Sequence, residues 1–311
     1  MRILFFGCDD FAAVSLGRLL DDGHKVVGLV TQPDRPKGRG LHLVFSATKQ
    51  VAGAHGVDVF QPLTLKEPAV LERLAAFRAD IFVVVAYGKI LPVDILNLPS
   101  YRCINVHASL LPRYRGAAPV NWAVINGETR TGVTIMQMSP GMDEGDILAS
   151  ESCAVALEMT SAELRVRLAE IGAGLLSRTL PRIKAGEIVP VPQDHSRATY
   201  AAKLHKELGR INWNSTARAV HDLVRGLQPW PGAFIFWRGH MVKILEASPV
   251  PLAAAGRPGE IVALHKEGFC VRAADQAVLI RRVHPAGSRP MDARAFLAGH
   301  KLVVGDILEK S

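Results

Sequence analysis

The sequence lacks the long apolar runs of a membrane protein. None of its stretches approaches the roughly 20 continuous apolar residues that a membrane-spanning helix needs. The first apolar run, Ile3 to Phe6, is too short for the core of a signal peptide, and only Met1 and Arg2 precede it. Since 49% of the 311 residues are hydrophobic and 21% are charged, a mainly disordered or collagen-like chain is also excluded. We therefore expect a folded cytoplasmic protein without a membrane partner.

Cysteine is scarce and scattered. The chain has four cysteines, Cys8, Cys103, Cys153 and Cys270, which lie far apart and form no C-x-x-C pair. The sequence also has no H-E-x-x-H motif. These absences argue against both a zinc site and a disulfide framework, so we expect reduced thiols and no metal.

The common nucleotide-binding and nucleophile motifs are missing too. The turn after the first apolar run reads G-C-D-D-F-A, in which Gly7 is the only glycine, so the G-x-G-x-x-G fingerprint fails. Asp9 and Asp10 would also repel a pyrophosphate. Because the sequence has neither a P-loop lysine pattern nor a G-x-S-x-G elbow, a dinucleotide enzyme and two other frequent uses of an α/β sheet are disfavoured.

Positive charge is unevenly distributed. The formal net charge is +8, and residues 206–311 hold 15 of the 37 Lys and Arg but only 9 of the 29 Asp and Glu. An excess of six positive charges in one third of the chain favours a polyanionic partner, for which nucleic acid is the usual candidate. A merely solvated basic face is an equally good explanation of the charge alone.

The pattern of apolar runs predicts an α/β fold. Short β-branched runs at residues 2–6, 26–30, 81–86 and 103–106 alternate with stretches of helical spacing. This alternation is typical of a mostly parallel, Rossmann-like sheet covered by helices on both faces, and the run at residues 132–138 could extend it. We assign the catalytic domain to residues 1–188.

A second domain is expected after a linker. A long helix should begin at Thr160, where Thr160 and Glu163 form a capping box, and Pro181 should kink or end it. Residues 189–205, with two prolines and few apolar anchors near their start, are taken as a linker. Residues 206–311 then show one helical pattern and five short strand-like runs separated by Gly and Pro, which predicts a small OB-like β-barrel.

A dense polar cluster marks the end of the run at residues 103–106. In an extended segment Asn105 and His107 point the same way, which would place an amide beside an imidazole at a carboxyl strand end, where open α/β sheets bind ligands. The Gly-flanked acidic turn that holds Asp143 follows the run at residues 132–138 and could approach the imidazole if the two strands are neighbours. Taken alone, a structural histidine and an ordinary turn are the commoner explanations.

These residues also carry a family resemblance. N-V-H-x-S-L-L-P-R-x-R-G at residues 105–116, followed by G-x-D-x-G-D at residues 141–146, resembles the signature of the formyltransferases that use 10-formyltetrahydrofolate. T-Q-P-D-R-P-K-G-R-G at residues 31–40 resembles the RNA-contacting loop of that family, and Q-P-W-P-G at residues 228–232 resembles the entry to its second domain. The resemblance runs from residue 3 to about residue 240. In the first turn, Cys8 and Asp9 replace the usual Thr and Pro, and Leu41 and His42 replace the lysines that usually follow the loop.

The resemblance implies a specific activity. Within the family the chain is most similar to members whose acceptor is methionyl initiator tRNA, with 10-formyltetrahydrofolate as the formyl donor. It implies that Asn105, His107 and Asp143 are catalytic. The implied folate-binding residues are Ser109, Leu110, Leu111 and Pro112. The implied tRNA-binding residues are Arg35, Lys37 and Arg39, together with the basic β-barrel domain. We expect a monomer.

Three other functions remain open from the sequence. The acceptor could be an amino sugar on a nucleotide, or water could replace the amine in a formyltetrahydrofolate hydrolase. The basic loop and the basic last third favour tRNA over both. The third alternative is a non-catalytic RNA-binding module, which the intact trio of Asn105, His107 and Asp143 disfavours.

Overall fold

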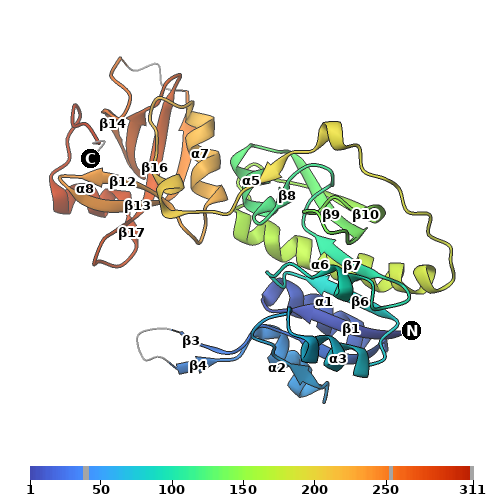
Figure 1. Ribbon diagram of the computed structural model, residues 1–311. Helices are drawn as coiled ribbons and strands as arrows, with labels where there is room; N and C mark the ends of the chain where they lie inside the picture. Colours follow the sequence, from blue (N-terminus) through green and yellow to red (C-terminus); the bar gives the residue numbers. More distant parts are fainter. Residues whose placement is uncertain (38–41, 252–254, 309–311) are drawn as a thin grey trace. The chain divides into compact units, whose positions relative to one another are not determined.

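The computed structural model describes residues 1–37, 42–251 and 255–308, and for residues 35–37 and 42–44 it describes only the backbone. The chain divides into two compact units (Figure 1). The first comprises residues 1–119, 130–154 and 165–201, and the second comprises residues 120–129, 155–164 and 202–311. Among the described residues, no helix combines the length and the apolar character that crossing a bilayer requires.

The first unit is built on a seven-stranded sheet in the order β10-β9-β7-β6-β1-β2-β5. Its parallel strands are β1 (Arg2–Gly7), β2 (Lys25–Val30), β5 (Val59–Phe60), β6 (Ile81–Val85) and β7 (Cys103–His107). β9 (Arg130–Gln137) pairs antiparallel with β7, and β10 (Ile147–Ala154) pairs antiparallel with β9. The predicted mostly parallel sheet is therefore confirmed. Its central strands β1 and β6 are buried nearly throughout, as is typical of parallel strands with helices on both faces.

Helices pack on both faces of this sheet. They are α1 (Asp10–Asp21), α2 (Ala47–Ala54), α3 (Pro68–Ala76), α4 (Val93–Leu96) and α6 (Ser161–Lys184). On one face, Phe6 and Val84 pack with Leu74 of α3 and Ile95 of α4 in a single apolar core. On the other face, α6 approaches so closely that a Cβ at Gly172 would lie 3.1 Å from Val106 of β7.

The contacts made in the first turn explain why Gly7 and the unusual pair of Cys8 and Asp9 occur there. A Cβ at Gly7 would lie 2.7 Å from Cβ of Ala12, so only glycine lets α1 start this close to the sheet. Cys8 Sγ accepts hydrogen bonds from the Thr31 hydroxyl at 3.4 Å and from the Gln32 amide at 3.2 Å. Asp9 caps α1 by accepting the Ala12 N–H at 3.1 Å. Both residues that depart from the family pattern, Cys8 and Asp9, therefore accept hydrogen bonds in this region.

Helix α6 begins as predicted and continues past Pro181, where the sequence predicted a kink or an end. The Thr160 amide donates to Glu163 Oε2 at 2.8 Å, and the Glu163 amide donates to Thr160 Oγ1 at 3.3 Å, which completes the capping box. Pro181 lies inside the helix, which continues to Lys184. Because a proline so near the C-terminus removes only one hydrogen bond to the preceding turn, the last turn still forms.

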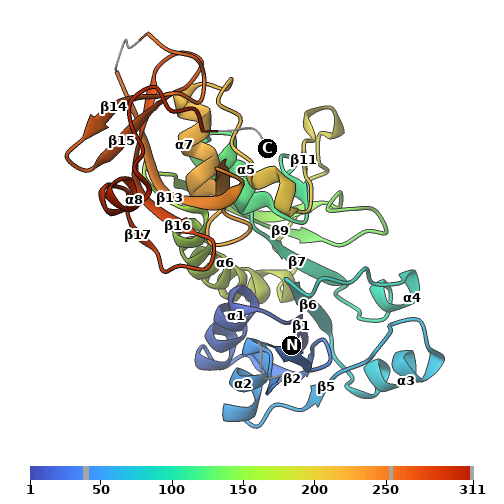
Figure 2. The ribbon, with the colours of Figure 1, turned by 90° about the vertical axis from the view of Figure 1, so that its left-hand side faces the viewer.

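The second unit contains an antiparallel sheet in the order β12-β13-β16-β15-β14, with β17 beside β16 (Figure 2). Its strands are β12 (Ala233–Trp237), β13 (His240–Val250), β14 (Ile261–His265), β15 (Gly268–Arg272), β16 (Ala277–Pro285) and β17 (Met291–Asp292). Helices α7 (Ala217–Gly226) and α8 (Ala293–His300) close its apolar core, which includes Trp213, Phe269 and Phe296. The predicted small β domain is confirmed. Its five longer strands fall at the strand-like runs of the sequence, which are residues 233–237, 241–245, 260–264, 269–273 and 278–283.

Polar side chains of α7 fix two other segments of the second unit. Arg225 and Asp222 are each 3% exposed and form an ion pair of 2.8 Å. Arg225 Nη1 also donates to the Met159 carbonyl at 2.9 Å, and His221 Nε2 lies 3.1 Å from the Leu157 carbonyl oxygen. Helix α5 (Pro119–Ile125) contributes as well, because the Asn121 amide donates to the Gly226 carbonyl at 2.8 Å.

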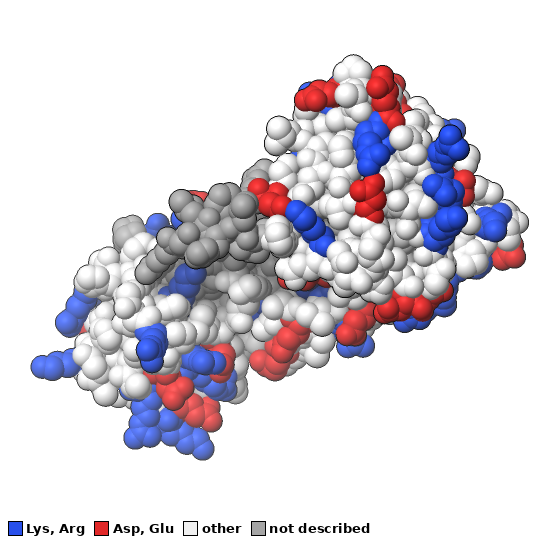
Figure 3. Space-filling model, turned by 90° about the horizontal axis from the view of Figure 1, so that it is seen from below, with Lys and Arg blue, Asp and Glu red and all other residues white. Residues whose placement is uncertain are grey.

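Short elements complete the description. β3 (Arg35–Lys37) and β4 (His42–Val44) pair antiparallel, and β8 (Arg115–Gly116) pairs parallel with β11 (Tyr200–Ala201). Two short 3-10 helices cover His195–Arg197 and Lys206–Gly209. On the face drawn in Figure 3, Lys and Arg side chains stand singly and in small groups, with Asp and Glu between them.

Candidate active site

Asn105 and His107 lie at the carboxyl end of β7, between β6 and β9. Asn105 is aligned with Val84 and Met136, and His107 is aligned with Thr134. Val106 packs toward α6, so alternation along the strand turns Asn105 and His107 to the opposite face of the sheet. The Asn105 amide is half-buried and makes no hydrogen bond to the residues that the structure describes, which leaves its two N–H groups for a ligand.

The His107 ring is held between a carbonyl and a carboxylate. It is only 6% exposed. Its Nε2 atom lies 2.9 Å from the Tyr114 carbonyl oxygen, which can only accept, so Nε2 must carry a hydrogen. Its Nδ1 atom lies 3.6 Å from Oδ2 of Asp143. Nδ1 is therefore the nitrogen that can exchange a proton with the acid or with a substrate.

Asp143 is fixed by its own backbone conformation and by β8. Its φ angle is 50°, a left-handed conformation that a non-glycine residue adopts at some cost and that is common at functional sites. Its Oδ2 atom accepts the Gly116 amide hydrogen at 2.8 Å. The turn is tight at Gly145, where a Cβ would lie 1.8 Å from the Gln137 carbonyl oxygen. This turn, which follows β9, brings the carboxylate of Asp143 to the imidazole of His107 on β7.

The predicted folate segment forms a compact turn next to His107. Ser109 Oγ donates to the Arg113 carbonyl at 2.6 Å, and the Ser109 carbonyl accepts from the Thr134 hydroxyl at 2.7 Å. The Leu111 amide donates to the same hydroxyl at 3.1 Å, and the Leu111–Pro112 peptide is cis. Leu110 and Pro112 are half-buried, so they offer apolar surface. The hydroxyl and the carbonyl of Ser109 are already engaged in the hydrogen bonds of the turn.

The predicted tRNA-binding cations are placed only in part. Arg35 and Lys37 belong to β3, whose backbone pairs with β4. Arg39 lies outside the described residues. At the base of this hairpin, Lys49 forms an ion pair with Asp34 and donates to Gln61 Oε1 at 2.9 Å. The Lys49 hydrogen bond is the main cause that lowers the pKa of Asp34 below its ordinary value.

Sequence reasoning missed the residues that support the trio. Arg115 and Gln193, 2% and 5% exposed, are hydrogen-bonded to each other, and Gln193 also contacts the Asp143 turn. Nothing local marks Gln193 as functional, since it stands in a proline-rich stretch far from its partners in sequence. No group of three or more His, Cys, Asp or Glu that could hold a metal ion occurs in the described part of the chain.

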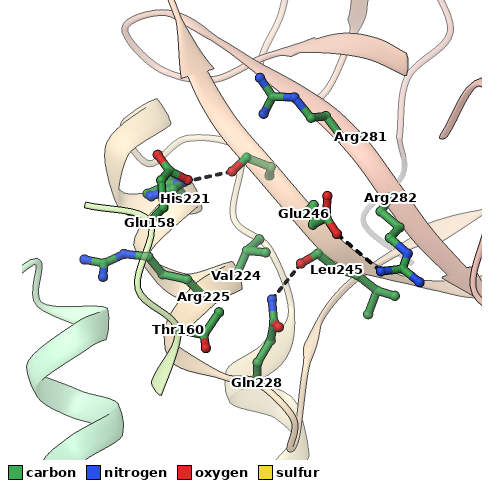
Figure 4. Close-up of a pocket in the computed structure, with 11 residues that line it drawn as sticks. Glu158, Thr160, His221, Val224, Arg225, Gln228, Leu245, Glu246, Arg281 and Arg282 are labelled. Carbon is green, nitrogen blue, oxygen red and sulfur yellow. Dashed lines mark hydrogen bonds and ion pairs between the residues drawn. The ribbon is translucent and has the colours of Figure 1, made fainter. Parts of the chain in front are cut away.

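A cavity of about 370 Å³ lies in the second unit (Figure 4). It is lined by Glu158, Thr160, His221, Val224, Arg225, Gln228, Leu245, Glu246, Ala247, Arg281 and Arg282. Glu246 and Arg282 form an ion pair of 3.4 Å within its wall, whereas Arg225 and Arg281 pair with Asp222 and Glu267 outside the lining. None of the predicted site residues lines it. The candidate active site is therefore the cluster in the first unit.

Comparisons with known proteins identify the family of the chain. The sequence model of the family described as Formyl transferase matches residues 1–180, and that of the formyl transferase C-terminal domain matches residues 203–301. The chain is 45% identical to the methionyl-tRNA formyltransferase of Caldanaerobacter subterraneus over 310 residues, which covers 99% of this chain and 100% of the relative.

Two solved structures show the same fold at lower identity. HypX from Aquifex aeolicus in complex with tetrahydrofolic acid is 21% identical, with a TM-score of 0.63, and the match covers 100% of this chain and 50% of HypX. The N-formyltransferase from Helicobacter canadensis in complex with folinic acid and dTDP-3-aminofucose is 16% identical, with a TM-score of 0.65 and coverage of 90% and 98%.

Proposed function

The chain belongs to the methionyl-tRNA formyltransferase family, and we propose that it transfers the formyl group of 10-formyltetrahydrofolate to the α-amino group of methionyl initiator tRNA. The observation that supports this proposal best is that the chain is 45% identical to a methionyl-tRNA formyltransferase over 310 residues. The second support is the cluster of Asn105, His107 and Asp143 at one sheet edge.

The reaction needs a neutral amine, a stabilised oxyanion and a proton acceptor. The nitrogen lone pair forms a bond to the formyl carbon, and the carbonyl oxygen takes up negative charge. The carbonyl then re-forms as the bond to N10 of the folate breaks, and N10 takes up the proton that the amine has lost. An α-amino group with an ordinary pKa of about 7.7 to 8.0 is easily deprotonated near neutral pH.

The residues divide these tasks between them. We assign the Asn105 amide to the developing oxyanion, where one well-placed donor lowers the barrier by about 3 kcal/mol. Because Nε2 of His107 is occupied by the Tyr114 carbonyl, a protonated Nδ1 is the second donor. Asp143 keeps that proton in place and accepts the proton of the amine, directly or through water.

Partner binding follows from the surrounding surfaces. Leu110, Leu111 and Pro112 supply an apolar wall for the folate, beside backbone groups of their turn. We assign recognition of the tRNA to Arg35, Lys37 and Arg39 and to the basic residues of 206–311, because phosphate contacts require such cations. The enzyme acts as a monomer in this proposal.

An amino-sugar acceptor and hydrolysis are the rival functions. The likeness to the Helicobacter canadensis enzyme is a likeness of fold alone, since only 16% of the aligned residues are identical. The relative that matches the whole chain at 45% identity is named for methionyl-tRNA. A hydrolase would also have no use for the basic second unit.

One assay separates the three functions. The protein is incubated with formyl-labelled 10-formyltetrahydrofolate and, separately, with methionyl initiator tRNA, methionyl elongator tRNA, an amino-sugar nucleotide or no acceptor. We expect label on the initiator tRNA, with much less on the elongator tRNA. Label on the nucleotide, or release of formate at the same rate without an acceptor, would contradict the proposal.

A further inference from the structure

The segment that follows α6 is attached to the active site along most of its length. Val191 forms a reciprocal pair of backbone hydrogen bonds with Ile147 of β10, at 2.8 and 2.9 Å. Ten residues later, the Ala201 carbonyl accepts the Ala117 amide hydrogen at 2.9 Å. All of these residues belong to the first unit. The stretch predicted as a linker therefore contributes structure to the catalytic region before it leads into the second unit.

Gln193 holds the turn that carries Asp143. Its Nε2 atom donates to the carbonyls of Asp143 and Gly145 at 2.9 and 2.7 Å. Its Oε1 atom accepts from Nε and Nη2 of Arg115 at 3.1 and 2.8 Å. Both amide hydrogens and both lone pairs are thus used, and the side chain is 5% exposed. A buried network that is fully satisfied in this way fixes one conformation of the turn.

Thr199 holds the residue that binds His107. Its Oγ1 atom accepts the Tyr114 amide hydrogen at 2.9 Å, and its carbonyl accepts the Arg115 amide hydrogen at 2.8 Å. Tyr114 in turn presents its carbonyl to Nε2 of His107. Tyr114 has a φ angle of 61°, a left-handed conformation that costs free energy unless its surroundings impose it. Thr199 is one of the groups that impose it.

Three successive residues connect this segment to the catalytic pair. Tyr114 contacts His107 through its carbonyl, Arg115 contacts Gln193 through its guanidinium, and Gly116 contacts Asp143 through its amide. The Arg115 side chain is 2% exposed, and a buried guanidinium needs acceptors, which Gln193 Oε1 supplies. Removing a bond at Gln193 or Thr199 would therefore move the imidazole and the carboxylate relative to each other.

We propose that Gln193 and Thr199 are positioning residues for formyl transfer, which set the distance and orientation between His107 and Asp143 without touching either substrate. This inference rests on the proposed function, since it concerns the same site. A misplacement of about 1 Å at a catalytic group lowers turnover about 100-fold, so bonds two steps from the chemistry are sufficient to affect the rate. A purely structural role would lower thermal stability and leave the turnover of the folded enzyme unchanged.

The first test separates kcat from KM in the full-length enzyme. Gln193→Met removes all four hydrogen bonds at similar side-chain length, and Gln193→Glu keeps the acceptor for Arg115 but loses both donors. We expect each to lower kcat by about 10- to 100-fold, while KM for both substrates changes less than about threefold. Ser196→Ala is the matched control, because the exposed Ser196 hydroxyl bonds only to Asp194 within the same segment. A kcat within twofold of the wild type in both Gln193 variants would overturn the proposal.

Thr199 provides an independent pair of variants, which decides the question if a Gln193 variant does not fold. Thr199→Val removes the acceptor of the Tyr114 amide with little change in volume, and we expect a tenfold or greater loss of kcat. Thr199→Ser keeps the hydroxyl and should recover most of that loss. Equal rates in the valine and serine variants, with both proteins folded by circular dichroism, would contradict a positioning role.

A double-mutant comparison tests whether Gln193 acts through Asp143. In an Asp143→Ala background, Gln193→Met should lower kcat no further, because the group that it positions is gone. A further loss as large as that in the wild-type background would overturn the inference. Absence of formylation by the wild-type enzyme would instead refute the proposed function, so the two failures are distinguishable.

Discussion

The Nδ1 atom of His107, at the end of β7, lies 3.6 Å from Oδ2 of Asp143, which belongs to the turn between β9 and β10. The antiparallel pairing places the end of β9 beside the start of β7, where Gln137 is aligned with Ile104. The turn after β9 must therefore fold back along the sheet to bring Asp143 to His107. An imidazole with one nitrogen fixed by a carbonyl and the other facing a carboxylate is suited to move a proton at Nδ1.

Replacing Asp143 by Asn should lower kcat by about 100-fold or more, because the charge that faces Nδ1 is lost. The amide oxygen can still accept the Gly116 N–H, so the fold should be retained. Steady-state formylation of methionyl initiator tRNA measures the effect, and Glu144→Gln in the same turn is the control. A kcat within a few-fold of the wild type would remove Asp143 from the mechanism.

Asn105→Ala and His107→Ala should each reduce turnover by about 100-fold or more while tRNA binding changes little. The reason is that the proposed mechanism assigns both side chains to the oxyanion, which exists only during the reaction. Single-turnover formylation gives the rate, and filter binding gives the affinity for tRNA. If either variant formylates at a near-normal rate, its residue is not a donor to the oxyanion.

The affinity for tRNA should fall steeply with salt, because each phosphate bound by Lys or Arg releases counterions. We expect a loss of at least about tenfold between roughly 50 and 200 mM salt. Replacing Arg35, Lys37 and Arg39 together by Ala should reduce the slope of log affinity against log salt by about two to three. Lys25→Ala, at the exposed start of β2, is the control. An affinity that does not respond to salt would contradict the assigned RNA surface.

Arg225→Met should lower the free energy of unfolding of the second unit by about 3 kcal/mol, because it leaves the buried Asp222 carboxylate without its closest buried partner. Arg218→Met is the matched control. Arg218 binds the same carboxylate at 2.8 Å, but its side chain is 44% exposed, and such pairs contribute about 1 kcal/mol or less. Urea denaturation measures both, and equal losses would refute the argument from burial.

Acid should remove the stabilising contribution of the contact between Asp34 and Lys49 by protonating the Asp34 carboxyl. Its pKa is lower in the folded protein than the ordinary 3.8, mainly because of the Lys49 hydrogen bond. The ionised form therefore stabilises the fold above the ordinary pKa, and this contribution disappears as pH falls through the lowered value. Lys49→Met should raise the pKa of Asp34, measured by NMR titration of the carboxyl carbon, whereas Lys66→Met should not. An unchanged pKa in the Lys49 variant would show that another group lowers it.

Local sequence patterns predicted the elements better than the connections between distant residues. The capping box of Thr160 and Glu163 and the strand runs at residues 81–85 and 233–237 follow from neighbours in the chain, so they could be found without coordinates. The spacing of Asn105 and His107 likewise follows from strand geometry.

The support of the site could not be predicted in the same way. Gln193 is 50 residues from Asp143 and 78 from Arg115, so only the folded chain shows that they are bonded. Pro181 was expected to disturb α6, but the helix has only three residues left after it and loses a single hydrogen bond. Burial and long-range pairing decided the case of Gln193, which no local motif encodes, whereas the outcome at Pro181 depends on how close it lies to the end of the helix.

Helix α7 depends on carbonyl groups that lie far upstream in the sequence, and this limits where the chain can be cut to give a stable fragment. A fragment that starts at residue 206 would include Arg225 and His221 but would lack the carbonyl oxygens of Met159 and Leu157. Two buried polar side chains would then have lost acceptors that they have in the intact chain. The C-terminal third is therefore best studied with the rest of the polypeptide, since some of the atoms that complete its interior are supplied from upstream.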